Sequence, residues 1–225
     1  MSTELIVREL GLRDYISVWN AMREFTQKRS ATTQDELWLV EHHPIFTLGQ
    51  AGKAEHILQT TDIPIVRTDR GGQVTFHGPG QVVGYVLLDL RRKKIGIRPL
   101  VALLEQVIID LLADYQIVAS NRCDAPGVYI EGEKICSIGL RVKQGCTYHG
   151  FALNVDLDLK PFKMINPCGF SGLKMTQLSY YQKQFSKLKL HEQLVAYMVQ
   201  KLGYTSAHVS TTENNERLLM GVHNG

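Results

Sequence analysis

The sequence predicts an α/β protein of the α+β type, in which helices pack on a mixed sheet. Its composition of 44% hydrophobic and 21% charged residues is typical of a globular chain. Apolar residues recur at helical spacing in three segments, while other segments alternate or cluster as strands do. Because no internal repeat or low-complexity linker divides the 225 residues, we expect a single domain over residues 1–225.

Helices and strands are both predicted in the first half of the chain. The spacing of apolar residues indicates an amphipathic helix over residues 12–29, with Asp14 available near its N-terminus. A second helix is expected to begin at Pro99 and to run through Tyr115, since leucine, valine and isoleucine recur along one face. Strands are predicted at residues 36–42, 63–67, 73–77 and 81–90.

The second half begins as a meander of antiparallel strands. We expect these strands at residues 127–130, 135–143 and 147–155, joined by turns at Glu131-Gly132-Glu133 and Gln144-Gly145. Residues 160–178 contain several prolines and glycines and are predicted to be loops. A final helix is expected at about 190–202, and the polar residues from about 205 to 225 predict a loosely ordered tail.

Charge and hydropathy exclude several classes of partner. The net charge of +3, from 25 Lys and Arg against 22 Asp and Glu, is too small and too dispersed to indicate nucleic-acid binding. Apolar stretches such as Val82–Leu90 are far shorter than the ~20 residues of a membrane span, so no membrane partner is expected. The N-terminal segment MSTELIVREL has no apolar secretory region. These observations favour the cytoplasm.

The four cysteines do not form a recognisable framework. Cys123, Cys136, Cys146 and Cys168 include no CxxC pair, so neither disulfides nor a zinc site is expected. The eight histidines are scattered as well, and no metal site is predicted. The thiols are therefore expected to be four buried small hydrophobes, or three of these and one reactive group.

The densest cluster of unusual residues is the segment RGGQVTFHGPGQ, residues 70–81. It loosely resembles a dinucleotide-binding loop, but such a loop opens into a helix, whereas residues 81–90 are strand-like. A plain glycine-rich hairpin would explain the turn at residues 78–80. It would not explain the polar residues that surround two adjacent glycines, which favour a ligand-binding loop. These polar residues are Arg70, Gln73, Thr75 and His77.

Segments spread over roughly residues 35–180 resemble the lipoyl(octanoyl) transferases. Besides RGGQVTFHGPGQ, the similar segments are WLVEHHPIFTLGQ (38–50), GEKICSIGLRV (132–142), YHGFALNV (148–155) and INPCGF (165–170). They occur in the order expected of that family. The resemblance implies the α/β fold of the biotin/lipoate ligase and transferase superfamily, with no cofactor.

Cys168 is the candidate nucleophile. It lies in a loop between Pro167 and Gly169, where a thiol can meet a substrate, and the resemblance matches it to the cysteine that becomes acylated. A free thiol has a pKa of ~8.5, so a nearby cation is needed to favour the thiolate at neutral pH. The resemblance nominates Lys134 for this role, and contact between Lys134 and Cys168 is therefore expected.

The resemblance implies a covalent double displacement. Cys168 would accept an octanoyl group from octanoyl-acyl carrier protein and pass it to a lysine ε-amine on a lipoyl domain. The expected acceptors are the lipoyl domains of 2-oxoacid dehydrogenase E2 subunits and the glycine cleavage H protein. We hypothesise that Lys134 acts first as a cation beside the thiolate and then as the base that accepts a proton from the acceptor amine.

The resemblance also implies a set of substrate-binding residues. Backbone N–H groups of its small residues are candidates for stabilising the oxyanion of acyl transfer, and Phe151 is a candidate wall of the acyl channel. His77 and His149 either shape the site or are structural histidines with satisfied hydrogen bonds. The substrate-binding candidates are Arg70, Gly71, Gly72, Gln73, Val74, Thr75, Phe76, His77, Ser137, Ile138, Gly139, Gly150, Phe151 and Ala152.

Three other functions are compatible with parts of this pattern. An ATP-dependent lipoate or biotin ligase would share the fold but would need no cysteine. An acyl-binding module would hold the carrier protein without passing on the acyl group. A cysteine hydrolase would use the thiol but release free octanoate.

Overall fold

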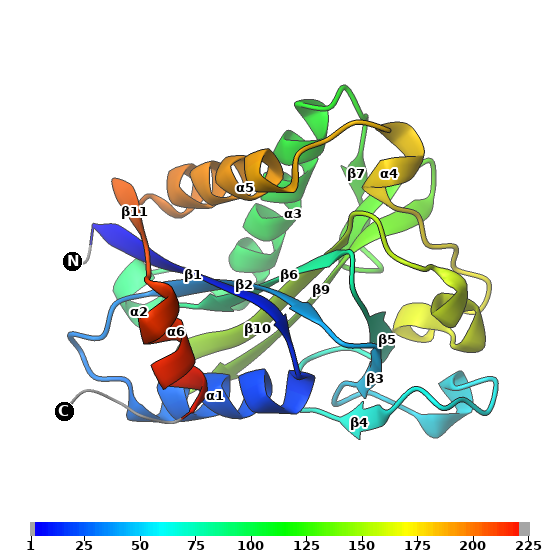
Figure 1. The fold of residues 1–225 in the computed structure, drawn as a ribbon, viewed down its shortest axis with the longest axis horizontal. Helices are drawn as coiled ribbons and strands as arrows, with labels where there is room; N and C mark the ends of the chain where they lie inside the picture. The colour runs from blue at the N-terminus through cyan, green and yellow to red at the C-terminus, as the bar shows by residue number, and fades with distance from the viewer. Residues whose placement is uncertain (1–2, 221–225) are drawn as a thin grey trace.

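A mixed sheet runs through the centre of the molecule, with helices on both of its faces (Figure 1). The computed structural model describes residues 3–220. Within these residues, eight strands pair in the order β11-β1-β2-β6-β10-β9-β8-β7. β1 is parallel to β2 and β11, and the other neighbours are antiparallel, so the predicted mixed sheet is confirmed. The strands are β1 (Glu4–Arg13), β2 (Glu36–His42), β6 (Gln81–Leu87), β7 (Ser120–Asn121), β8 (Gly127–Ile130), β9 (Glu133–Lys143), β10 (Cys146–Asn154) and β11 (Ser206–Val209).

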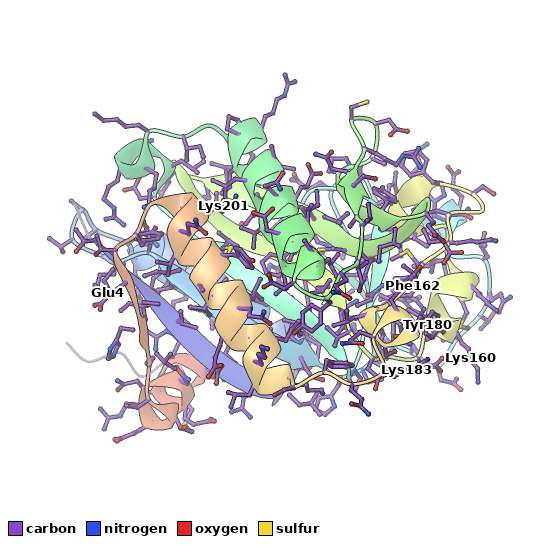
Figure 2. The ribbon with its side chains drawn as sticks, turned by 90° about the horizontal axis from the view of Figure 1, so that it is seen from above. Glu4, Lys160, Phe162, Tyr180, Lys183 and Lys201 are labelled. Atoms are coloured by element: carbon purple, nitrogen blue, oxygen red, sulfur yellow. The ribbon has the colours of Figure 1, made fainter. Side chains whose placement is uncertain are left out.

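The helices form two layers around this sheet. α3 (Ile97–Ala113) and α5 (Lys187–Leu202) cover one face, while α1 (Tyr15–Lys28) and α6 (Thr212–Leu219) cover the other (Figure 1). α3 and α5 pack side by side, and the Nζ of Lys201, labelled in Figure 2, lies 2.7 Å from a carboxylate oxygen of Asp110. Two short helices are α2 (Leu90–Lys93) and α4 (Leu178–Tyr181). None of the helices in residues 3–220 combines the length and apolar character that a membrane crossing requires.

The predicted meander forms β8, β9 and β10. Both connections are two-residue turns in which each central residue has a positive φ: 50° and 85° at Glu131 and Gly132, and 54° and 81° at Gln144 and Gly145. This conformation matches the right-handed twist of the strands that it joins. The antiparallel order read from the sequence is therefore confirmed.

A second, three-stranded sheet within the described residues lies beside one end of the large sheet. Its order is β4-β3-β5, with bounds β3 (Ile45–Leu48), β4 (Ile65–Arg67) and β5 (Val74–His77). β3 was not predicted. The alternative of a plain hairpin across residues 78–80 is wrong, because β5 pairs with β3 whereas β6 pairs with β2 and β10. The turn at residues 78–80 instead carries the chain from one sheet to the other.

Both ends of the described chain are more ordered than the sequence predicts. β1 occupies the N-terminal segment, where Leu5 and Val7 are fully buried on one face, and the predicted helix begins only at Tyr15, after its Asp14 cap. The loosely ordered tail predicted from about 205 is wrong for residues 206–219. β11 adds to the edge of β1, and α6 buries Leu218. Residues 221–225 of the predicted tail lie outside the described residues.

Candidate active site

Cys168 lies in a tight loop beside β5. It is the central residue of the 3₁₀ turn Pro167–Gly169 and has φ 57° and ψ 14°, in the left-handed region that non-glycine residues rarely adopt. The preceding Asn166 donates its backbone N–H to the His56 carbonyl at 2.8 Å, which ties the loop to a neighbouring segment. Strained backbone of this kind clusters at functional sites because surrounding contacts must hold it.

Lys134 meets the Cys168 thiol although the two residues are far apart in the sequence. Its Nζ lies 3.0 Å from the Sγ of Cys168 and donates to the Pro126 carbonyl at 2.9 Å. The side chain is 1% exposed, and its ammonium lies 5.3 Å from the centre of the Tyr129 ring. An irregularity in the β8–β9 register, beside Tyr129, aims Lys134 toward this position instead of into the main core.

The charges of Lys134 and Cys168 are coupled. Burial disfavours the ammonium, but a thiolate at Cys168 and the neighbouring Tyr129 oppose that effect and raise the pKa of Lys134 above its ordinary value. The lysine is therefore charged as long as the sulfur is negative. When the sulfur loses its negative charge, the Cys168 thiolate no longer raises the pKa of Lys134.

The other three thiols have different surroundings. Burial raises the pKa of Cys136 to about 12 and also raises the pKa of Cys146, so both remain protonated thiols at neutral pH. Cys123 is exposed, so the expectation that all unreactive thiols are buried is wrong for this residue. Of the four cysteines, Cys168 is the one with a lysine ammonium within hydrogen-bond distance.

Cys168 lines a cavity together with residues of the paired strands β9 and β10. Nearly all of the residues singled out in the sequence meet here, although they come from four separate segments. Gly139 allows the glycine-rich loop to lie directly on the sheet, since a Cβ there would be 3.0 Å from the Gly71 carbonyl oxygen. The predicted residues that line the cavity are Arg70, Gly71, Gly72, Gln73, Val74, Thr75, His77, Ser137, Ile138, Gly139, His149, Gly150, Phe151, Ala152 and Cys168.

Arg70 organises the glycine-rich loop from within. The guanidinium is buried and donates to the carbonyls of Thr47 at 2.6 Å, Gly71 at 2.9 Å and Gln73 at 2.7 Å. Burial lowers the pKa of Arg70. Two of these carbonyls belong to the loop and the third to β3, so Arg70 ties the loop to β3 and shapes the backbone that faces the cavity.

Two predicted phenylalanines turn their rings away from the cavity. Phe76 packs in the core of the small sheet, with ring centres 5.4 Å from Phe46 and 5.6 Å from Phe162, which is labelled in Figure 2. The Phe151 ring lies on the α3/α5 face of the large sheet, in the space that a Cβ of Gly84 would occupy. Phe151 is among the residues that line the cavity, while its ring packs in the core on the α3/α5 face.

Three lining residues were not found from the sequence: Tyr15, Val83 and Tyr85. Tyr15 lies on the buried face of α1, and its ring stacks on His77 with centres 5.8 Å apart. The tyrosine hydroxyls point to buried partners, Tyr15 to Thr68 at 3.2 Å and Tyr85 to His42 at 2.7 Å. The rings therefore offer largely apolar surface to the cavity.

His149 is held by a half-buried carboxylate, that of Asp69, which the sequence did not reveal. Its Nε2 lies 2.9 Å from Asp69, which also accepts from Trp19 at 2.9 Å and from Tyr148. Burial opposes the charge of Asp69, but these three hydrogen bonds outweigh it and lower the pKa of the carboxyl. Burial lowers the pKa of His149, so the neutral ring donates from Nε2 to the Asp69 carboxylate.

Comparison with known proteins identifies the family. The model of the lipoyl protein ligase A/B catalytic domain matches residues 14–212. The chain belongs to this family. An octanoyltransferase of Vibrio vulnificus (strain YJ016) is 55% identical over 211 residues, covering 94% of this chain and 97% of that protein. An octanoyltransferase of Klebsiella pneumoniae is 54% identical over 201 residues, covering 89% and 94%.

Solved structures of ligases share the fold of this lipoyl protein ligase A/B catalytic domain. A lipoate-protein ligase A bound with ATP has a TM-score of 0.76 at 13% identity, covering 99% of this chain and 94% of that one. A biotin protein ligase from Aquifex aeolicus has a TM-score of 0.53 at 9% identity, covering 97% and 74%. At these identities the likeness shows the fold alone. The predicted family and superfamily fold are both confirmed.

Proposed function

We propose that this chain is an octanoyltransferase that works through a thioester on Cys168. The donor is octanoyl-acyl carrier protein, and the acceptor is the ε-amine of a lysine on a lipoyl domain. The observation that carries the proposal is the 3.0 Å contact between Lys134 Nζ and the Sγ of Cys168, a residue that lines the cavity. The octanoyltransferases that are 54–55% identical to the chain support the choice of acyl group.

Acylation begins with the Lys134 ammonium beside the Cys168 thiolate. The sulfur attacks the thioester carbonyl carbon, a new carbon–sulfur bond forms, and the bond to the carrier's sulfur breaks. The carrier leaves as a thiolate and takes a proton from Lys134, which becomes a neutral amine. Backbone N–H groups of the glycine-rich loop are candidates for stabilising the oxyanion of this step.

Deacylation uses the neutral amine that acylation leaves behind. Acylation removes the negative charge on sulfur that favours the ammonium, so burial favours an uncharged Lys134. The acceptor lysine attacks the octanoyl carbonyl as a free amine, after losing one proton to solvent. It gives a second proton to Lys134 as the amide forms, and Cys168 leaves as the thiolate. These two steps together restore the starting ion pair of Lys134 and Cys168 and consume no nucleotide.

The proposed partners follow from this reaction. They are acyl carrier protein, the lipoyl domains of 2-oxoacid dehydrogenase E2 subunits and the glycine cleavage H protein. A cytoplasmic location and a single catalytic domain over residues 1–225 stay predictions from the sequence. The ATP-dependent ligase is the alternative, since solved ligases share the fold. The cysteine–lysine contact supports the transferase, because adenylate chemistry does not call for a thiol.

A turnover assay with alternative donors tests the proposed function. The purified chain and a lipoyl domain are incubated either with octanoyl-acyl carrier protein alone or with octanoate, ATP and magnesium. We expect an octanoylated domain from the carrier thioester without nucleotide. Product that forms only from octanoate and ATP would establish the ligase instead. Free octanoate released from the carrier without modification of the domain would establish a hydrolase.

A further inference from the structure

The residue register of the paired strands β9 and β10 locates the groups that lie along the cavity. Their register pairs Ser137 with Ala152, Gly139 with Gly150 and Leu140 with His149. A Cβ on Gly127 would be 3.2 Å from Lys134 Nζ, and Gly127 pairs with Ser137 on the neighbouring strand. The Lys134 ammonium, and the Cys168 sulfur 3.0 Å from it, therefore lie near the level of Ser137.

His149 lies farther along these two strands, away from the level of Ser137. It is opposite Leu140, three residues along β9 from Ser137, which corresponds to ~10 Å of strand. A fully extended octanoyl chain advances ~1.25 Å for each of its seven carbon–carbon bonds, or ~9 Å, at ordinary bond lengths and tetrahedral angles. A chain attached to Cys168 and laid along the two strands would bring its terminal methyl to His149.

The backbone at His149 places its side chain on the cavity side. Phe151 and Leu153 point to the α3/α5 face, and strand alternation would send His149 there too. Its φ of 59° breaks the alternation. The imidazole instead stacks on Tyr148, which belongs to the core on the α1 face, with ring centres 5.0 Å apart. Such a conformation is costly for a non-glycine residue, and the structure maintains it where the side chain meets the cavity.

Neighbouring groups hold this side chain in place. The hydrogen bond from Nε2 to Asp69 fixes one edge of the ring, and Tyr85 packs against it with centres 6.1 Å apart. His149 is 1% exposed, and within residues 3–220 its buried Nδ1 has no hydrogen-bond partner. The ring is therefore anchored from behind, with the edge that carries Nδ1 unbonded.

We propose that His149 is the wall that ends the acyl cavity and thereby sets the length of the chain that the enzyme transfers. Asp69 is a positioning residue that keeps this wall from swinging aside. The inference rests on the proposed octanoyl transfer. It predicts that chains longer than eight carbons are rejected because they meet the imidazole, and that removing the imidazole admits them.

Donors of graded length test this assignment in the variant His149→Gly. Glycine tolerates φ 59°, so the substitution removes the wall and relieves the backbone. The measured quantity is kcat/KM for octanoyl-, decanoyl- and dodecanoyl-acyl carrier protein, each with the same lipoyl domain. Each additional buried methylene is worth a factor of about four, so we expect decanoyl to gain about 15-fold relative to octanoyl.

Gln144→Gly is the matched control. Gln144 also has a positive φ, 54°, but it lies exposed in the β9–β10 turn and does not line the cavity. It should keep the preference of the wild type for octanoyl. If His149→Gly folds poorly, His149→Asn provides a second test, because asparagine also tolerates this backbone.

The outcomes separate this inference from the proposed function. An unchanged ratio of decanoyl to octanoyl in folded His149 variants that still transfer octanoyl would overturn the wall and leave the transferase intact. An equal gain in Gln144→Gly would assign the effect to backbone strain and would overturn it too. No transfer by the wild type from any carrier thioester would refute the proposed function, and the inference with it.

Discussion

Replacing Gly127 with alanine should displace Lys134 from Cys168 while both of those residues stay unsubstituted. The new Cβ would lie 2.8 Å from Lys134 Cε and 3.2 Å from Lys134 Nζ, and it would overlap the Cys136 carbonyl oxygen. The alanine would also have to adopt a φ of 139°. Since ordinary contacts to a Cβ begin at 3.4 Å, the lysine must retreat by about 0.6 Å. The retreat lengthens a charge-assisted hydrogen bond that is now 3.0 Å.

Losing such a bond costs about 1.5–3 kcal/mol. Acylation of Cys168 should then slow by about 10- to 150-fold. The assay is single-turnover acylation by octanoyl-acyl carrier protein, followed by mass spectrometry, together with urea unfolding to measure the loss of stability. Gly132→Ala is the matched control, because Gly132 also has a positive φ, 85°, yet nothing lies within 4 Å of the position that a Cβ would take there. Equal acylation rates in the two variants would refute the idea that the placement of Lys134 activates the thiol.

Three further predictions follow from the site. Lys134→Arg keeps a cation but removes the base, so quench-flow should show acylation slowed less than the transfer to the lipoyl domain; equal slowing of both steps would contradict the base role. Burial lowers the pKa of His77 to about 3 in the folded state. As the pH falls below ~6.5, His77 is therefore protonated in the unfolded state while it is still neutral in the folded state. The free energy of unfolding should therefore fall by about 2 kcal/mol between pH 8 and pH 5, and urea titrations should show less of this fall in His77→Asn. Asp69 has a lowered pKa, so the contribution of its carboxylate to the free energy of unfolding is present above pH ~3.9 and is lost at lower pH. In urea unfolding, Asp69→Asn should be less stable than the wild type at pH 7, and the difference in the free energy of unfolding should narrow at pH 3. A constant difference would rule out the ionised carboxylate as the source of that stability.

Local patterns in the sequence predict the elements better than the way they assemble. The turns at residues 131–132 and 144–145 have a glycine where a positive φ is needed, so the meander can be read directly. Alternation identifies strands at residues 73–77 and 81–90 but does not specify their partners. The hairpin alternative fails for this reason, since β5 and β6 lie in different sheets. The polar C-terminal strand and helix escape detection because a sheet edge and few apolar side chains hold them.

The candidate site shows the same division. Cys168 and Lys134 can be nominated from motifs, while their contact depends on a register irregularity that no local pattern reveals. No motif in the sequence marks Asp69 or Tyr85, and their contacts with His149 are seen only in the folded structure. The side of the sheet that His149 faces cannot be read from alternation either, because one left-handed residue reverses it.

The intact mass of the protein after incubation with octanoyl-acyl carrier protein tests the central claim most directly. Wild type should gain one octanoyl group, Cys168→Ala should gain none, and adding a lipoyl domain should discharge the adduct with octanoylation of the domain. An adduct that persists in Cys168→Ala, or an octanoylated domain formed by that variant at the wild-type rate, would contradict a thioester on Cys168.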